Sequence, residues 1–542
     1  MRLNIQELAN RDQWEKAGIR LPEFDIKAMI AKTKKNPQWV HFGPGNIFRA
    51  FPAAKQQTLL EEGEADTGII VAETHDYEVI DKLFLPHDNL TLSVTLKVDG
   101  STDTAIIASV AEALKADSGD KDFDRLEEIF RSPSLQMVSF TITEKGYNLT
   151  AASGALVYGV EEDFRSGPAA PVSSMGKVAA LLYQRYLAGQ LPVTLVSMDN
   201  CSHNGDRLRD AVLAFARSWR ENGHTEAGFE AYIENPAKVG FPWSMIDKIV
   251  PRPDDSVSAI LADKGVQGME GQVTAKGTYS APFVNSEELE YLAIQDVFPN
   301  GRPPLEKTGV IFTDRETVDR VEKMKVCICL NPLHTCLAIF GCLLGYTRIS
   351  DEMKNPCLKK LVEIVGYREG LPVVVDPGIV SPREFIDNVI TVRLPNPFMP
   401  DTPQRIATDT SQKIPVRFGE TIKAYMASET LNVDDLKLIP LVLAAWLRYL
   451  MGIDDEGKPF EISPDPLLPS LKAALSGVKL GDKGPFRSVL QPILSNKGIF
   501  AVDLYEAGLG ERVERCFEEL VHGPGAVAET LKRYVWGDSA EH

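Results

Sequence analysis

Residues 38–42 (QWVHF), followed at once by residues 43–46 (GPGN), form the stretch that decides the fold. The first five residues predict a short extended strand, and the Gly-Pro-Gly turn leads into a helical pattern over residues 47–62. After a polar turn, residues 68–72 (GIIVA) predict a second, buried strand that ends at Glu73. A strand, glycine turn, helix and strand in this order favour a parallel crossover unit.

Strand-like and helical runs continue to alternate over the first 250 residues. The further strand-like runs are 90–98, 104–110, 137–142 and 193–198, and the helical runs between them are 122–131, 175–188 and 207–222. This alternation predicts a doubly wound α/β domain over residues 1–300, with a helical extension at residues 1–37. A Pro/Gly-rich stretch near residue 300 marks its end, and helical periodicity then predicts a mainly α-helical domain over residues 301–542.

The Gly-Pro-Gly turn is also a candidate phosphate-binding loop. Its pattern is G-x-G-x-x-F, with Phe48 where a dinucleotide-binding loop has a third glycine, and such a turn alone is usually only a turn. The strand before it, the helix after it and Glu73 at the end of the next strand favour a dinucleotide site. A carboxylate at Glu73 accepts from ribose hydroxyls and repels a 2′-phosphate, so we expect NAD rather than NADP. Asp76 is the alternative for this role.

The charge and the apolar segments restrict the class of protein. Lys and Arg number 58 against 76 Asp and Glu, a net charge of −18, which argues against nucleic acid and anionic membrane surfaces as partners. The N-terminal residues lack a hydrophobic segment, so we expect a cytoplasmic protein. The longest apolar stretch, residues 326–346, is interrupted by polar residues and predicts buried helix, with a membrane span as the less favoured alternative.

Seven cysteines are spread unevenly, and five of them fall between residues 327 and 357. They predict core thiols rather than a disulfide framework. A zinc site at these cysteines and His334 is the alternative, but the paired C-x-x-C spacing of structural zinc is missing. We therefore expect no metal.

The segment 41–50 (HFGPGNIFRA) resembles the opening of the polyol-specific long-chain dehydrogenases, the mannitol dehydrogenase family. The likeness recurs in family order at 141–147 (TITEKGY), 196–205 (VSMDNCSHNG), 246–251 (IDKIVP), 330–334 (LNPLH) and 396–401 (NPFMPD). The resemblance implies an N-terminal Rossmann-type domain and a helical C-terminal domain. It also implies NAD-dependent, metal-independent hydride transfer in the cleft between them.

The resemblance further implies a catalytic set of Lys325 as general acid/base, Asn331 and Asn200 as oxyanion donors, and His334. A lysine base must have a pKa lowered toward neutrality, and amide groups can stabilise an alkoxide. The family pattern places the asparagine five residues after the lysine, whereas Asn331 lies six after Lys325. Because one residue turns an α-helix by about 100°, we expect a π-bulge or kink between Val326 and Leu330 to absorb the extra residue.

Further positions are assigned by the same resemblance. Arg405 and Lys413, with His334, match the family's substrate contacts, and a bidentate arginine suits a carboxylate. The implied cofactor-binding set is Gly43, Gly45, Asn46, Ile47, Phe48, Arg49, Glu73, Asp199, Asn200 and Asp247. Structural roles remain open as alternatives. These are a solvated helix lysine for Lys325, a buried helix-breaking amide for Asn331, a core histidine for His334, a turn residue for Asn200, a helix cap or ion pair for Asp247, and a surface charge pair for Arg405 with Lys413.

The sequence of residues 329–337 (CLNPLHTCL) is more similar to the family's mannonate branch than to its mannitol branch. It implies interconversion of D-mannonate and D-fructuronate, with mannitol and tagaturonate as alternative substrates. A rival of another class is a non-catalytic NAD-binding sensor that lost its chemistry through the displaced lysine. We expect a small-molecule partner only, in a monomer or small homo-oligomer, and a cationic substrate pocket within this acidic protein.

Overall fold

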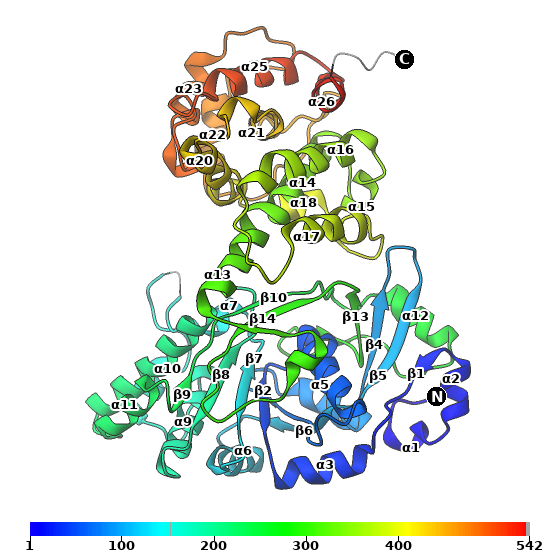
Figure 1. The fold of residues 1–542 in the computed structure, drawn as a ribbon, viewed down its shortest axis with the longest axis vertical. Helices are drawn as coiled ribbons and strands as arrows, with labels where there is room; N and C mark the ends of the chain where they lie inside the picture. The colour runs from blue at the N-terminus through cyan, green and yellow to red at the C-terminus, as the bar shows by residue number, and fades with distance from the viewer. Residues whose placement is uncertain (152, 538–542) are drawn as a thin grey trace. The chain divides into compact units, whose positions relative to one another are not determined.

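A computed structural model of the chain describes residues 1–151 and 153–537 (Figure 1). Its contacts divide the chain into two compact units: unit 1 holds Met1–Lys97 and Ser101–Asp319, and unit 2 holds Val98–Gly100 and the residues from Arg320 on. The division falls later than the predicted 300/301 boundary. The reason is that β15 (Ile311–Thr313) still pairs with β14 (Tyr291–Gln295) of unit 1.

Unit 1 is built on a six-stranded sheet in the order β6-β3-β2-β7-β8-β9, with every pair parallel. The strands are β2 (Trp39–Phe42), β3 (Ile69–Glu73), β6 (Val110–Lys115), β7 (Met137–Phe140), β8 (Val193–Ser197) and β9 (Val239–Gly240). Numbered along the chain, this order is 3-2-1-4-5-6, the Rossmann arrangement. The predicted doubly wound α/β fold is confirmed.

Helices pack on both faces of this sheet: α4 (Asn46–Ala50), α5 (Pro52–Glu61), α6 (Lys121–Arg131), α9 (Ser174–Leu187) and α10 (Asn204–Glu221). Alternate residues of β2 point to opposite faces. Val40 and Phe42 join the apolar cluster under α6, α9 and α10, whereas Trp39 joins the one under α4 and α5. The helix predicted over 47–62 is two helices, because Phe51 before Pro52 leaves the helical region.

The two strand-like runs at 90–98 and 104–110 lie outside the main sheet, which corrects our expectation. They form β4 (Thr91–Leu96) and β5 (Thr102–Ile107) of a second sheet, ordered β1-β5-β4-β13, with β1 (Ile19–Arg20) and β13 (Phe283–Glu287). The third strand of the main sheet, β6, begins at Val110, directly after β5. With only Ala108 and Ser109 between the two strands, the sequence pattern did not separate them.

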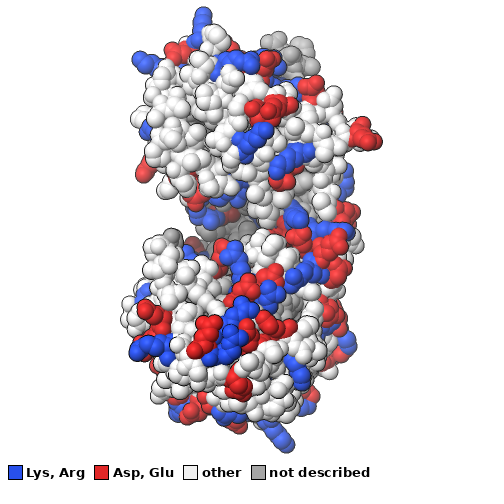
Figure 2. All heavy atoms as spheres, turned by 90° about the vertical axis from the view of Figure 1, so that its left-hand side faces the viewer, with Lys and Arg blue, Asp and Glu red and all other residues white. Residues whose placement is uncertain are grey.

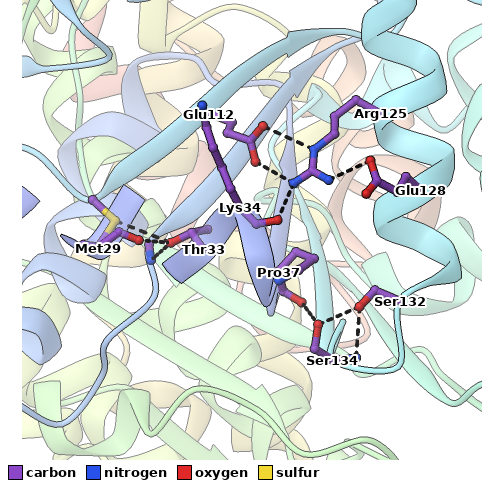
Figure 3. Close-up of polar contacts among 10 residues, drawn as sticks. Met29, Thr33, Lys34, Pro37, Glu112, Arg125, Glu128, Ser132 and Ser134 are labelled. Carbon is purple, nitrogen blue, oxygen red and sulfur yellow. Dashed lines mark hydrogen bonds and ion pairs between the residues drawn. The ribbon is translucent and has the colours of Figure 1, made fainter. Parts of the chain in front are cut away.

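The N-terminal extension is mostly helical, with α1 (Ile5–Leu8), α2 (Arg11–Lys16) and α3 (Ile26–Lys35). The guanidinium of Arg125 on α6 binds Glu112 of β6 and also donates to the carbonyl oxygen of Lys34 at 2.8 Å (Figure 3). Thr33 Oγ1 donates to the Met29 carbonyl oxygen and accepts from the backbone of Gly68. These contacts fasten α3 to the β6 edge of the sheet.

The remaining elements of unit 1 connect or flank the two sheets. They are η1 (Ile80–Phe84), η2 (Leu85–His87), α7 (Thr143–Gly146), α8 (Val160–Ser166), α11 (Ala227–Glu234), β10 (Ser244–Asp247), α12 (Asp255–Asp263), β11 (Gln272–Val273), β12 (Tyr279–Ser280) and η3 (Leu305–Thr308). Strand β10 pairs with β14, and β11 pairs with β12.

Unit 2 is helical throughout its described elements, as predicted. They are α13 (Arg315–Met324, which spans the division), η4 (Lys325–Cys329), α14 (Asn331–Leu343), α15 (Ile349–Glu352), α16 (Pro356–Ile364), η5 (Val365–Gly370), η6 (Leu371–Val373), α17 (Pro382–Asn388), η7 (Val389–Arg393), α18 (Pro403–Ile406), α19 (Thr410–Ile414), η8 (Pro415–Gly419), α20 (Glu420–Ala427), η9 (Val433–Asp435), α21 (Leu438–Tyr449), α22 (Leu468–Leu475), α23 (Arg487–Leu494), α24 (Lys497–Phe500), α25 (Gly510–Leu520) and α26 (Ala526–Trp536). Helices α14 and α21 are buried on almost all sides and form the centre of the unit.

One described helical run, Arg315–Leu343, is long and apolar enough to cross a membrane by length and composition. Of its most apolar window, 83% is buried inside the protein, as in the core helix of a folded domain. The prediction of a buried helix at 326–346 fits this observation.

The charged side chains are mixed on the face that Figure 2 shows. Lys and Arg there are interspersed with Asp and Glu, and neutral residues cover much of the rest. On this face the described residues therefore form no continuous basic surface.

Candidate active site

A cavity of about 740 Å³ opens in unit 1 at the carboxyl ends of β2, β3 and β7. Part of its lining comes from four segments that follow these strands or begin α9, within residues 43–46, 73–77, 141–149 and 172–177. Residues within 157–160 and 276–280, including Lys276, complete it together with Val79. The strand order reverses between β2 and β7, and ligands of open α/β sheets bind at such a switch point.

The two glycines of the turn differ in what they require. Gly43 has φ +80°, and a Cβ there would lie 2.5 Å from the carbonyl oxygen of Thr141, so the fold itself needs glycine. A Cβ on Gly45 would meet only the Gly43 carbonyl oxygen, at 3.9 Å. Because Gly45 lines the cavity, its missing side chain lets a ligand approach the backbone closely.

Phe48 explains why the third glycine is absent. Its ring stacks on buried His41 at a centroid distance of 3.9 Å, so helix and strand are joined here by two flat rings. His41 Nδ1 lies 2.7 Å from Ser139 Oγ and Nε2 lies 2.9 Å from Thr141 Oγ1, which in turn donates to the Gly43 carbonyl oxygen at 2.7 Å. Burial lowers the pKa of His41 to about 3, so the ring supports the turn in its neutral form.

Glu73 and Asp76, the two candidates for ribose recognition, both line the cavity but have different contacts. Glu73 Oε1 accepts from the backbone N–H groups of His75 and Asp76, and burial raises the pKa of its carboxyl group. Asp76 Oδ2 accepts a 2.6 Å hydrogen bond from Thr274 Oγ1. Asp76 thus already holds a neighbouring loop, which leaves Glu73 the better candidate.

Lys177 on α9 is a cavity residue that the sequence analysis missed. Its Nζ donates to the Thr74 carbonyl oxygen at 2.8 Å and to the Tyr77 hydroxyl at 2.6 Å, so it fixes the segment after Glu73. Burial lowers the pKa of Lys177 to about 8. A lysine directly before the apolar run of residues 178–182 in α9 was the signal available.

Asp199 holds the loop after β7. Its carboxylate accepts from the backbone N–H groups of Ile142 and Thr143 and from the Tyr147 hydroxyl at 2.5 Å. Asn200, the next residue, is exposed at the carboxyl end of β8.

The other residues assigned to the cofactor lie outside the cavity lining. Arg49 is buried and donates to the carbonyl oxygen of Ala281 and to Asn46 Oδ1. It therefore stabilises the turn without lining the cavity. Asp247 is buried at the end of β10, in another sheet. Of the assigned set, Gly43, Gly45, Asn46 and Glu73 line the cavity.

In unit 2 the displaced lysine begins a π-helix. Residues Lys325–Cys329 are π-helical, and the Leu330 N–H donates to the Lys325 carbonyl oxygen at 3.1 Å, five residues back. The predicted π-bulge between Val326 and Leu330 is therefore confirmed. Since a π-turn takes up one extra residue, six residues here cover about the 500° that five cover in an α-helix. Lys325 is 4% exposed, which contradicts the reading of a solvated helix lysine.

Asn331 and His334 open the central helix α14. The Asn331 carbonyl oxygen accepts from Thr335 Oγ1 at 2.9 Å, and His334 Nε2 lies 3.6 Å from Asp401 Oδ2. Burial lowers the pKa of His334, and nearby arginines add to this effect against the opposing charge of Asp401. His334 is therefore a buried imidazole beside the carboxylate of Asp401.

Arg405 and Lys413 have partners within the protein. The Arg405 guanidinium pairs with Asp401, and its side chain is 63% exposed. Lys413 Nζ donates to the carbonyl oxygens of Ile406 and Thr408, and burial lowers its pKa. Both side chains are thus already engaged by protein groups, whereas the resemblance implied that they contact the substrate.

Two further cations of unit 2 were not assigned from the sequence. Arg393 ends the π-helix η7 and is 2% exposed, and Arg417 lies in the π-helix η8. The charges of both help to lower the pKa of His334, so both lie near it. Apolar periodicity does not distinguish a π-turn from an α-turn, so the direction in which these two arginines point could not be predicted from the sequence.

No group of three or more His, Cys, Asp or Glu side chains suited to a metal ion occurs among residues 1–151 and 153–537. All seven cysteines are free thiols, and those at 329, 336 and 342 are buried.

Comparisons with known proteins cover nearly the whole chain. Residues 37–307 match the family model described as the mannitol dehydrogenase Rossmann domain, and residues 317–521 match the mannitol dehydrogenase C-terminal domain. D-mannonate oxidoreductase of Thermotoga maritima is 56% identical over 99% of both chains. D-mannonate oxidoreductase of Escherichia coli is 30% identical over 86% of this chain and 89% of its own.

Solved structures agree with these matches. The ternary complex of Pseudomonas fluorescens mannitol 2-dehydrogenase with NAD and D-mannitol has a TM-score of 0.68 at 26% identity, covering 98% of this chain and 99% of that one. A substrate-free D-sorbitol dehydrogenase has a TM-score of 0.78 at 26% identity, covering 94% and 97%. With both domains matched in order, the chain belongs to the mannitol dehydrogenase family.

Proposed function

We propose that the protein is an NAD-dependent secondary-alcohol dehydrogenase that interconverts D-mannonate and D-fructuronate. The observation that carries this proposal is the 56% identity, over 99% of both chains, to the D-mannonate oxidoreductase of Thermotoga maritima. At that identity and coverage, a change of substrate class would have to arise within a closely similar site.

NAD fits the cavity of unit 1. Gly45 offers backbone against which a pyrophosphate can lie, and Glu73 offers a carboxylate for the ribose hydroxyls. When bound, NAD supplies the hydride acceptor or donor. The remaining chemistry belongs to the side chains of the protein.

Lys325 is the proposed general acid/base. During oxidation, its neutral amine takes the proton of the secondary hydroxyl while the hydride leaves the carbon that bears this hydroxyl. During reduction, the protonated lysine returns a proton to the alkoxide that hydride addition forms. Asn331 and Asn200 donate to the developing oxyanion, and His334 binds a substrate hydroxyl. The π-turn at Lys325 supports this assignment, because such turns often occur at functional sites.

Mannitol and altronate are the alternative substrates among polyols and sugar acids. The structural similarity to mannitol 2-dehydrogenase supports mannitol as an alternative. The test is NADH consumption by the purified enzyme with D-fructuronate, D-tagaturonate and D-fructose side by side. We expect the highest kcat/KM with fructuronate. A higher value with fructose or tagaturonate would contradict the substrate assignment.

The sensor alternative predicts a different result in the same assay. A non-catalytic protein would bind NADH, seen as a change in its fluorescence, but would turn over none of the three ketoses. The π-turn removes the reason for this alternative, because the extra residue before Asn331 is absorbed locally.

We further propose a metal-independent, cytoplasmic enzyme that acts on a small molecule, as a monomer or small homo-oligomer, without nucleic-acid or membrane partners. Activity that survives EDTA treatment, recovery in the soluble fraction of cells and a mass from light scattering would test these points.

A further inference from the structure

Three π-helices of unit 2 each carry one cation that lies wholly or partly within the protein. Lys325 begins η4, Arg393 ends η7 and Arg417 lies in the middle of η8. Segments η4 and η8 pack against each other. π-turns interrupt the regular hydrogen bonding of an α-helix, and they often occur at functional sites. Three such turns that each carry a cation are therefore an unusual feature of this unit.

Arg417 is held by the turn that carries Asn331. Its Nη1 donates to Thr335 Oγ1 at 2.6 Å and makes a longer contact of 3.5 Å with the Asn331 carbonyl oxygen. The Thr335 hydroxyl itself donates to that same carbonyl oxygen at 2.9 Å. One edge of the guanidinium is thereby fixed beside Asn331.

The rest of the guanidinium has no acceptor among the residues that the structure describes. No carboxylate within residues 1–151 and 153–537 forms an ion pair with Arg417, and burial lowers the pKa of its guanidinium to about 10. The side chain is only partly buried, so it keeps access to solvent. By contrast, Arg405 is already paired with Asp401.

Charges of both signs lie around Arg417, but the carboxylate of Asp401 is paired with Arg405, and those of Asp409 and Asp465 act on Lys413. The charge of Arg417 contributes to the lowered pKa of both His334 and Lys413, which places it near these two residues. Asp465, one carboxylate on this side, accepts from the backbone and hydroxyl of Ser411. A fixed, partly desolvated guanidinium that pairs with no carboxylate of the described residues is a site for an anionic ligand group.

We infer that Arg417 binds the carboxylate of the sugar-acid substrate and so selects an acid over a neutral polyol. This inference rests on the proposed function and adds the residue that recognises the anionic end. The Nη1 contact to Thr335 orients the guanidinium, and its free edge binds the two carboxylate oxygens. The carboxylate is thereby held next to Asn331, the proposed oxyanion donor.

The test compares full-length Arg417→Gln with the wild type, using NADH and either D-fructuronate or the neutral ketose D-fructose. We expect KM for fructuronate to rise on the order of 100-fold, with little change in kcat, because a desolvated charge partner is lost. Kinetics with fructose should stay close to wild type. Arg487→Gln, which changes an exposed arginine paired with Glu511, is the matched control and should change neither substrate's kinetics.

A purely structural role gives a different pattern. If Arg417 only supports Asn331, kcat falls for both ketoses alike, and that outcome overturns the inference. If Arg417→Gln does not fold, Arg417→Lys is measured instead. It keeps the charge but loses the bidentate geometry, so KM for fructuronate should rise roughly 10-fold, and an unchanged KM overturns the inference.

The two proposals fail separately. A wild type that prefers fructose to fructuronate overturns both the proposed function and the role of Arg417. A wild type that prefers fructuronate, with an Arg417→Gln variant of unchanged KM, overturns only the role of Arg417.

Discussion

The backbone N–H of Leu330 donates to the carbonyl oxygen of Lys325 at 3.1 Å, across five residues rather than four. This hydrogen bond closes the π-turn that separates Lys325 from Asn331. Because the turn absorbs one residue, the six-residue spacing here presents the lysine much as a five-residue spacing does on an α-helix. The lysine is buried as a result, as a proton-transferring group must be to act in a desolvated site.

Deleting one residue of the π-turn should convert it to an α-turn without rotating Lys325 away from Asn331. Cys327 is the best choice because its side chain is only partly buried. We expect the Cys327 deletion to retain clearly more turnover than Lys325→Ala, with Cys327→Ala as the control that keeps the chain length. A folded deletion variant as inactive as Lys325→Ala would contradict this account of the turn.

The two loop glycines should fail in different ways. Gly43→Ala places a methyl group against the Thr141 carbonyl oxygen at positive φ, so we expect a lower melting temperature and a loss of about 1–2 kcal/mol or more. Gly45→Ala adds a methyl group that meets no protein atom closer than 3.9 Å, so its stability should stay within about 0.5 kcal/mol of wild type.

The Gly45→Ala variant should nevertheless bind NADH roughly tenfold more weakly, equivalent to about 1.4 kcal/mol, because the methyl group occupies the pyrophosphate position. Fluorescence titration with NADH measures this. Wild-type affinity in a folded Gly45→Ala protein would place the pyrophosphate elsewhere.

Glu73 should set the preference for NAD. Glu73→Ser removes the carboxylate that repels a 2′-phosphate, and Lys177 and Lys276 in the same cavity remain to attract it. We expect the ratio of kcat/KM values for NADH and NADPH to fall on the order of 100-fold. Asp76→Asn is the control, and a larger shift there than at Glu73 would reverse the assignment of these two carboxylates.

Acid should destabilise unit 1 through His41. The folded pKa is lowered to about 3, whereas the unfolded histidine takes up a proton below about 6.5. The contribution of the neutral His41 ring to the free energy of unfolding is therefore complete above about pH 6.5 and decreases as the pH falls below that value. At pH 5 the loss is about 2 kcal/mol relative to pH 7. His334, with its pKa lowered by burial, adds in the same direction.

Thermal unfolding at pH 7 and pH 5 checks this linkage. The wild-type melting temperature should fall by several degrees more than that of His41→Gln, which lacks the titrating ring. Equal shifts in the two proteins would show that His41 does not govern the acid response.

The sequence predicted β2, β3, β7 and β8 of the main sheet, because these strands are short, buried and separated by helices. It missed β9 (Val239–Gly240), which is too short to show a pattern, and it missed β6. Where two strands follow one another without a helix, as β5 and β6 do around Ser109, the pattern could not separate them. The Gly43-Pro44-Gly45 turn and Glu73 were predicted from the same logic, and both line the cavity.

The site in unit 2 was harder to predict, for a physical reason. A π-turn changes the direction in which every later side chain of the helix points, and no residue type identifies such a turn in the sequence. The turn at Lys325 could be predicted because the family's lysine-to-asparagine spacing provided a reference there. At Arg393 and Arg417 no such spacing was available, so these cations were found only from the structure.

The central claim is that Lys325 transfers the proton that accompanies hydride transfer. The most direct test is the single-turnover rate of NADH oxidation with D-fructuronate in Lys325→Ala, with the exposed Lys323→Ala as its matched control. We predict a rate lower by about 10²–10⁴-fold in Lys325→Ala, with NADH binding unchanged and Lys323→Ala at the wild-type rate. A Lys325→Ala enzyme that turns over at the wild-type rate would contradict the claim.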